Sequence, residues 1–144
     1  MGRALRETDP MTLERRGLQI TIAVAALVPV YGGLAGVVLG ASAFGPWPGG
    51  AADSHTRYLS GLLLAIGLLF WSTIPAIERR TTMIRTLTFI VVAGGLARLA
   101  GAVFVHDPGT MGWALIMELV VTPGLCLWQA RLASRTGASP IAKP

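Results

Sequence analysis

Four long apolar runs constrain this chain more than any other feature, because each is long enough to cross a lipid bilayer. They cover approximately residues 18–39, 58–77, 84–105 and 111–132. A bilayer core of about 30 Å needs roughly 20 apolar residues in a helix. Helices satisfy all their backbone hydrogen bonds within the segment, and the runs are too long and continuous for barrel strands. The sequence therefore predicts an all-α integral membrane protein, a bundle of four transmembrane helices.

The composition supports a membrane protein. Of the 144 residues, 53% are hydrophobic and 13% are charged, whereas a soluble domain carries about 25% charged residues. The net charge of +5 does not indicate nucleic-acid binding, because the basic residues flank the apolar runs and do not form one patch. We expect the lipid bilayer as a partner, and no nucleic acid. The single Cys126 cannot form an intrachain disulfide.

The flanking charges predict the orientation. Basic residues precede the first run, separate the second from the third and follow the fourth: Arg3, Arg6, Arg15, Arg16, Arg79, Arg80, Arg85, Arg131, Arg135 and Lys143. The other two connections hold one basic residue, Arg57. The positive-inside rule therefore places both termini in the cytoplasm. The expected organisation is a cytoplasmic N-terminal segment 1–16, a transmembrane domain 17–132 and a cytoplasmic tail 133–144.

Two further features bear on the location. Arginine outnumbers lysine, and alanine and glycine are abundant, which is typical of a GC-rich bacterial genome and favours the bacterial inner membrane. The tripeptide at Ala41–Ala43 resembles a signal-peptide cleavage site. The apolar run before it is longer than the roughly 7–15 residues of a signal peptide, so we expect the first span to be retained.

Two opposite charges interrupt the third and fourth runs. Arg98 lies in the third run and Glu118 in the fourth, at mirror positions about Pro108 in the short connection "HDPGTMG". In an antiparallel helical hairpin this symmetry places both at the same depth, about 10 Å inside the outer interface at 1.5 Å per residue. A lone charge at a helix centre costs about 2.5–3.5 kcal/mol on insertion scales. We therefore predict that Arg98 and Glu118 form an intramembrane ion pair.

The role of this pair stays open between two interpretations. It is a structural bridge that fixes the register of the hairpin, or it is a site for a ligand or a proton, since ionisable groups in membranes are often functional. A neighbouring arginine favours the ionised carboxylate, which argues against a proton carrier. Arg57, at the start of the second run, either reaches the same carboxylate or extends to the lipid headgroups.

Small residues recur at helical spacing in the runs, which predicts close contact between helices. The candidate packing glycines are Gly32, Gly36, Gly40, Gly61, Gly94, Gly95 and Gly101. Such faces serve contacts within the chain or with other subunits equally well. Pro29 and Pro123 are expected to kink their helices.

No combination of residues indicates a reaction. Asp53, His55, His106 and Asp107 all fall on the predicted outer side, but their spacing matches no metal-binding motif. Phosphate loops, nucleophile elbows and haem-attachment motifs do not occur in the sequence. Glu78 is interpreted as an interfacial cap, and the four tryptophans as interface anchors. We therefore expect no metal, no cofactor and no catalytic residue.

Several stretches resemble a known family. They are "HTRYLSGLLLAIGLLFW", "IPAIERR", "RTLTFIVVAGGLARLAG" and "ELVVTPGLCLWQARLA". They are similar to a family of small bacterial four-helix membrane proteins catalogued as a domain of unknown function. The matching positions are His55, Arg57, Tyr58, Glu78, Arg85, Arg98, Glu118, Pro123, Trp128 and Gln129. The resemblance covers the last three runs and implies no activity.

Three functional hypotheses follow. The first is a non-catalytic accessory or assembly subunit of a membrane complex, with respiratory and photosynthetic complexes as candidates, in contact with other membrane subunits or with further copies of itself. The second is a small-molecule or lipid carrier that uses an Arg98–Glu118 site. The third is an intramembrane enzyme or lipid-binding protein. The absence of catalytic motifs and the several glycine faces favour the first.

Overall fold

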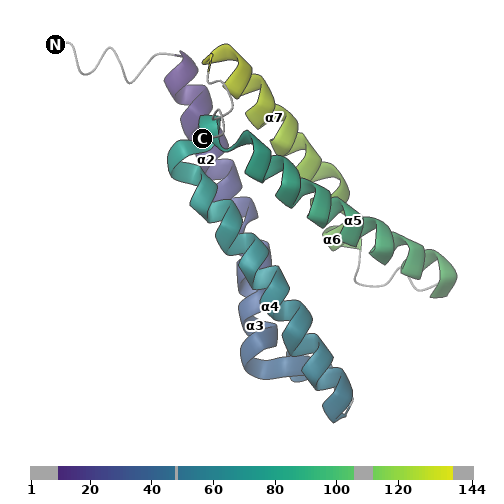
Figure 1. Ribbon diagram of the computed structural model, residues 1–144. Coiled ribbons are helices and arrows are strands. Elements are labelled where there is room, and N and C mark those ends of the chain that lie inside the picture. The colour runs from purple at the N-terminus through teal and green to yellow at the C-terminus, as the bar shows by residue number, and fades with distance from the viewer. Residues whose placement is uncertain (1–9, 48, 106–111, 138–144) are drawn as a thin grey trace, which may run out of the picture. The chain divides into compact units, whose positions relative to one another are not determined.

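The computed structural model describes residues 10–47, 49–105 and 112–137, and these residues are almost entirely helical (Figure 1). Four helical segments are long and apolar enough to cross a membrane: Pro10–Ala43, Gly50–Arg79, Thr81–Phe104 and Gly112–Arg135. The described residues contain no strand. The prediction of an all-α chain with four membrane-crossing helices is confirmed.

The contacts divide the chain into two compact units. One comprises Ile20–Ile74 and is called here the hairpin unit; the other comprises the described residues of 1–19 and 75–144 and is called the terminal unit. The helix α2 (Pro10–Ala25) contributes residues to both units.

The hairpin unit is built from two helices that run side by side (Figure 1). The helix α3 (Leu27–Leu39) is followed by a 3-10 turn, η1 (Gly40–Ala43), and then by α4 (Gly50–Thr73). A Cβ atom added to Gly33 would lie 2.8 Å from the Cα of Leu64, and one added to Gly67 would lie 3.0 Å from the backbone nitrogen of Val30. The two backbones therefore approach so closely that only glycine fits at these positions.

The predicted packing glycines of this unit behave differently from one another. Gly36 contacts the side chain of Ser60, so a Cβ atom there would clash with it. A Cβ atom at Gly32 would have only an ordinary contact, 3.9 Å from Leu63, and one at Gly61 would meet no described atom within 4 Å. The face of closest approach thus runs through Gly33 and Gly36. Gly61 makes no close contact with another helix of the described chain, so its packing against another subunit stays a prediction.

Pro29 explains why α2 and α3 are separate helices. A proline has no backbone N–H, so it cannot bond to the carbonyl of the residue four positions earlier, which here is Ala25, the last residue of α2. The helical bonds resume when the Val30 N–H donates to the Ala26 carbonyl at 3.1 Å. Near this break the indole of Trp71 donates to the Ala23 carbonyl at 3.0 Å. Trp71 thus binds a helix carbonyl, a role that its interpretation as an interface anchor did not include.

In the terminal unit, α5 (Thr81–Val105) lies beside a helix made of three parts (Figure 1). These are α6 (Gly112–Ile116), the π-helical turn η4 (Met117–Val121) and α7 (Thr122–Arg135). A Cβ atom at Gly95 would lie 2.9 Å from the Cβ of Glu118, so α5 and η4 are in close contact there. By contrast, a Cβ atom at Gly94 or Gly101 would meet no described atom within 4 Å.

A small core closes one end of the terminal unit. The turn η2 (Ile74–Arg79) contains the non-helical Ala76, with φ −128° and ψ 44°, and leads the chain into α5. Four of the fully buried side chains belong to this unit and are aliphatic: Leu18, Ile77, Ile84 and Leu132. The polar Gln129 is buried with an exposed fraction of 0%. This core joins the beginning of α2, the turn η2, the beginning of α5 and the end of α7.

The close approach at Gly33 generates a prediction. Gly33→Ala should destabilise the hairpin unit by about 1–3 kcal/mol, because the new methyl group meets backbone atoms that cannot rotate away. Gly32→Ala is the matched control on the same helix. It should be neutral or stabilising by up to about 1 kcal/mol, because alanine is the better helix former. Thermal unfolding of both variants in detergent measures the difference, and equal stabilities would contradict the packing described.

Candidate functional site

Arg98 and Glu118 meet in the terminal unit. The Arg98 Nε–H donates to Glu118 Oε2 at 3.1 Å, and Nη2 donates to Oε1 at 3.2 Å. The contact is therefore bidentate, with two parallel bonds between a planar guanidinium and a carboxylate, which is a strong geometry for such a pair. The two side chains are exposed to different extents, 40% for Arg98 and 19% for Glu118.

Local structure positions the carboxylate. Pro123 lies in the first turn of α7, where its ring would clash with the carbonyl four residues earlier in a regular α-helix. The preceding residues instead form the wider π-turn η4, in which both the backbone N–H and the hydroxyl of Thr122 bond to the Met117 carbonyl. Glu118 is the second residue of this turn. The missing Cβ of Gly95, one turn from Arg98 on α5, lets this segment approach.

The chemistry of the pair follows from its geometry. Each carboxylate oxygen of Glu118 accepts a bond from Arg98, so charge is balanced locally without a bound ion. Arg98 Nη1 makes no hydrogen bond within the described residues. The pair therefore joins two helices and leaves both N–H groups of Nη1 unused. Arg98 lies seven positions before the end of α5, or about 10 Å along the helix axis.

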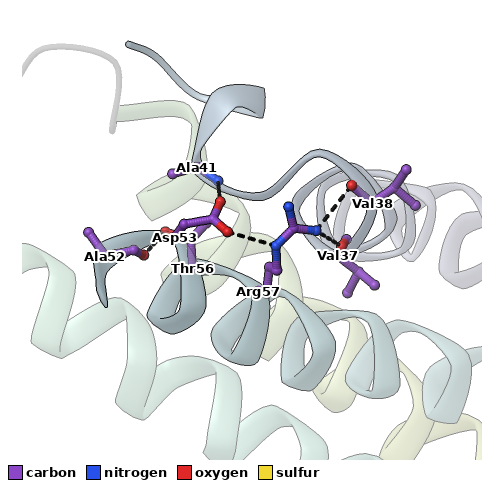
Figure 2. A network of polar contacts seen from close by, with 7 residues as sticks. All are labelled: Val37, Val38, Ala41, Ala52, Asp53, Thr56 and Arg57. Carbon is purple, nitrogen blue, oxygen red and sulfur yellow. Dashed lines mark hydrogen bonds and ion pairs between the residues drawn. The ribbon is translucent and has the colours of Figure 1, made fainter. Parts of the chain in front are cut away.

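Arg57 belongs to a separate network in the hairpin unit (Figure 2). Its Nε donates to Asp53 Oδ2 at 2.8 Å, and its Nη1 donates to the carbonyls of Val37 at 2.6 Å and Val38 at 3.1 Å. Asp53 Oδ1 accepts the Ala41 N–H at 2.8 Å. The sequence interpretation offered Glu118 or the lipid headgroups as partners of Arg57. The structure places Arg57 with Asp53 and the end of α3.

This network completes a helix end. The last carbonyls of a helix have no partner within the helix and carry partial negative charge, so the Arg57 cation satisfies them at the end of α3. Gly40 allows the turn, because its φ of +65° is unfavourable for other residues and an added Cβ would collide with the Asp53 carboxylate. Gly40 therefore allows the tight turn that follows α3. The spacing of Asp53 and Arg57 by four residues, acid first, is the sequence signal that identifies the pair.

Two of the four outer-side residues whose spacing matches no metal-binding motif, Asp53 and His55, lie in the described chain. Asp53 is held by Ala41 and Arg57, and His55 is exposed. His106 and Asp107 lie outside the described residues. No group of three or more metal-ligating side chains occurs among the residues that the structure describes.

A third polar cluster lies at the core of the terminal unit. Glu78 pairs with Arg15 at 2.7 Å, and Glu14 pairs with Arg135 at 3.0 Å. The indole of Trp128 also donates to Glu14, at 3.3 Å. Glu78 was interpreted from the sequence as an interfacial cap, and the structure gives it a partner 63 residues earlier in the chain.

Gln129 anchors the same cluster from within. Its Nε2 donates to the Ile77 carbonyl at 2.8 Å and to Thr81 Oγ1 at 2.9 Å. A buried amide of this kind satisfies the irregular backbone of η2 where no helical partner is available. Together with the ion pairs, it joins the beginning of α2, the connection between α4 and α5, and the end of α7 at one end of the unit.

The sequence also matches a known family. Residues 17–129 match the family described as Domain of unknown function (DUF4345). The chain belongs to this family. The match includes the first span, which the resemblance found in the sequence did not cover. No curated protein and no solved structure gives a significant match.

The family match covers most residues of the three polar clusters. The Arg57 and Arg98 contacts lie within residues 17–129, and the third cluster extends beyond this range at both ends, to Glu14 and Arg135. Of the positions found by resemblance, Arg57, Arg98, Glu118 and Gln129 all make hydrogen bonds that join separate segments. His55 and Tyr58 are exposed. The signature positions thus include residues that hold the helices together.

The ion pair predicts a compensating double substitution. Arg98→Leu leaves the Glu118 carboxylate unpaired and should lower the yield of inserted protein, in line with a cost of about 2.5–3.5 kcal/mol for a lone charge in a membrane helix. Arg98→Leu combined with Glu118→Leu removes both charges and should restore most of the yield. Quantitative immunoblots of purified membranes measure this. A double variant as poor as the single one would argue against pairing.

The Asp53 network predicts a second contrast. Asp53→Ala removes the acceptor of both Arg57 and the Ala41 N–H, so the unfolding temperature of the protein in detergent should fall clearly. Thr56→Ala is the matched control, because among the described residues the Thr56 hydroxyl bonds only to the Ala52 carbonyl of its own helix, at 2.9 Å (Figure 2). It should change the unfolding temperature little. If the unfolding temperature falls equally in both variants, the Asp53–Arg57 network does not stabilise the turn between α3 and α4.

Proposed function

We propose that this protein is a non-catalytic subunit that assembles with other proteins in the bacterial inner membrane, with both termini in the cytoplasm. The observation that carries the proposal is the bidentate geometry of the Arg98–Glu118 pair. A carboxylate with both oxygens bonded to one guanidinium is a poor general base or nucleophile. A pair of this kind instead fixes the relative depth of two helices, as a structural element of an assembly does.

The surface of the spans supports the assembly role. Large apolar side chains remain exposed along the helices, among them Tyr31 at 78%, Phe89 at 73% and Leu127 at 71%. Lipid tails cover such side chains, and so do helices of other membrane proteins, because association in membranes depends on close packing and polar contacts. The family description supplies no activity, and the proposal needs none.

The orientation rests on charge. Exposed arginines gather on segments of the terminal unit that share one end: Arg79, Arg80, Arg131 and Arg135. Positively charged segments stay on the cytoplasmic side during insertion. We therefore place this end, with the beginning of α2 and the end of α7, in the cytoplasm.

Purification from native membranes tests the proposal. The full chain with an affinity tag is extracted in mild detergent, and co-purifying proteins are quantified by mass spectrometry against an untagged strain. We expect at least one other membrane protein in stoichiometric amount, retained in the Gly32→Ala control variant. Recovery of the chain without any other protein would overturn the assembly role.

A second candidate, a carrier of small molecules or lipids, is favoured by one observation. Glu118 lies in a π-turn, and π-turns are frequent at functional sites. The same purification separates the two candidates, because a carrier would be recovered without other proteins and with a bound small molecule or lipid detectable by native mass spectrometry. The Glu118→Gln variant should then lose that molecule.

A further inference from the structure

The Arg98–Glu118 pair is incompletely satisfied within the described chain. Arg98 uses Nε and Nη2 for Glu118, while Nη1 makes no hydrogen bond to a described residue and the side chain is 40% exposed. Glu118 can accept more, because a carboxylate has about four lone-pair sites and its two bonds from Arg98 occupy only part of them. The pair therefore offers an unused donor and an unused acceptor at one depth in the membrane.

We infer that a second copy of this chain binds at this face, so that Arg98 of each copy donates to Glu118 of the other. Two copies inserted in the same orientation are related by a two-fold axis along the membrane normal, which preserves depth. Each unused donor then meets an unused acceptor, and four charges alternate in sign around the axis. Any other protein would need both an acid and a base at the same depth, a condition that a second copy meets automatically.

The surface around Arg98 permits the required close approach. Gly94 and Gly101 are exposed and lie on the same side of α5 as Arg98, four residues before it and three residues after it. Added Cβ atoms at the two glycines would meet no described atom within 4 Å. Small residues let two membrane helices come close enough for side chains to bond across the interface. The opposite side of α5 carries the larger Leu96 and Val103, which are exposed at 55% and 62%.

Self-association of this kind is independent of binding to other proteins. The dimer face is one side of α5 around Arg98, and the assembly role proposed above does not specify a face. Recovery of a stoichiometric partner without self-association would therefore refute the dimer and leave the assembly role intact. Self-association without any other protein would support the dimer and refute the assembly role.

Site-directed cross-linking of the full chain in native membranes tests the inference. Cys126→Ser removes the native thiol, and single cysteines are then introduced as Gly94→Cys or Gly101→Cys on the proposed face. Leu96→Cys and Val103→Cys, at similar depths on the opposite side, are the matched controls. A short bis-maleimide should yield a product of twice the chain mass at the first two positions and little at the controls.

The charge requirement is tested in the Gly94→Cys background. Removing both charges with Arg98→Leu and Glu118→Leu should reduce the cross-linked dimer roughly tenfold, as expected for the loss of two hydrogen-bonded contacts across a membrane interface. The inserted amount of each variant, measured in the same membranes, separates loss of association from loss of folding. Exchanging the charges with Arg98→Glu and Glu118→Arg preserves the alternation and should retain more dimer than the double-leucine variant.

Four outcomes would overturn the inference. These are no dimer at either glycine position, equal dimer on both sides of α5, a product with the mass of another protein, and a dimer that survives undiminished when both charges are removed.

Discussion

Pairing of charges inside an apolar helix assembly is the constraint on which this structure depends. Each of the four carboxylates in the described residues binds an arginine: Glu14 with Arg135, Asp53 with Arg57, Glu78 with Arg15, and Glu118 with Arg98. Three of these pairs join segments that are far apart in the sequence. In a bilayer the hydrophobic effect does not hold helices together, so polar bonds of this kind and close backbone packing must set how the helices align.

The features of this architecture that could be predicted from the sequence are those that depend on position along the helix axis. The length of the apolar runs is sufficient to predict four helices, because a bilayer imposes a minimum span. The mirror positions of Arg98 and Glu118 about a short turn are sufficient to bring the two charges together, since an antiparallel hairpin has little freedom in register. Both predictions use distances along the chain, which sequence gives directly.

Other features depend on rotation about the helix axes, which the sequence specifies poorly. Gly32 and Gly33 are neighbours of the same type, yet only Gly33 lies where two backbones meet. Gly94 and Gly95 differ in the same way. The pairing of Glu78 with Arg15 joins residues separated by most of two helices, so no local spacing indicates it. Asp53 and Arg57 could have been paired from their spacing alone, but the carbonyls of α3 that complete the network become visible only when the corner is folded.

The π-turn before Pro123 also has a consequence for the whole of α7. A π-turn holds one residue more than the α-helical turn that it replaces, so every side chain beyond it is rotated by about 100° relative to an uninterrupted helix. Glu118, within the turn, binds Arg98, and Gln129, beyond the turn, binds Ile77 and Thr81. Glu118 and Gln129 are eleven residues apart, so an uninterrupted α-helix would present them on nearly the same face. The extra residue of the π-turn turns them onto different faces of the segment, where they bind partners from different places in the chain.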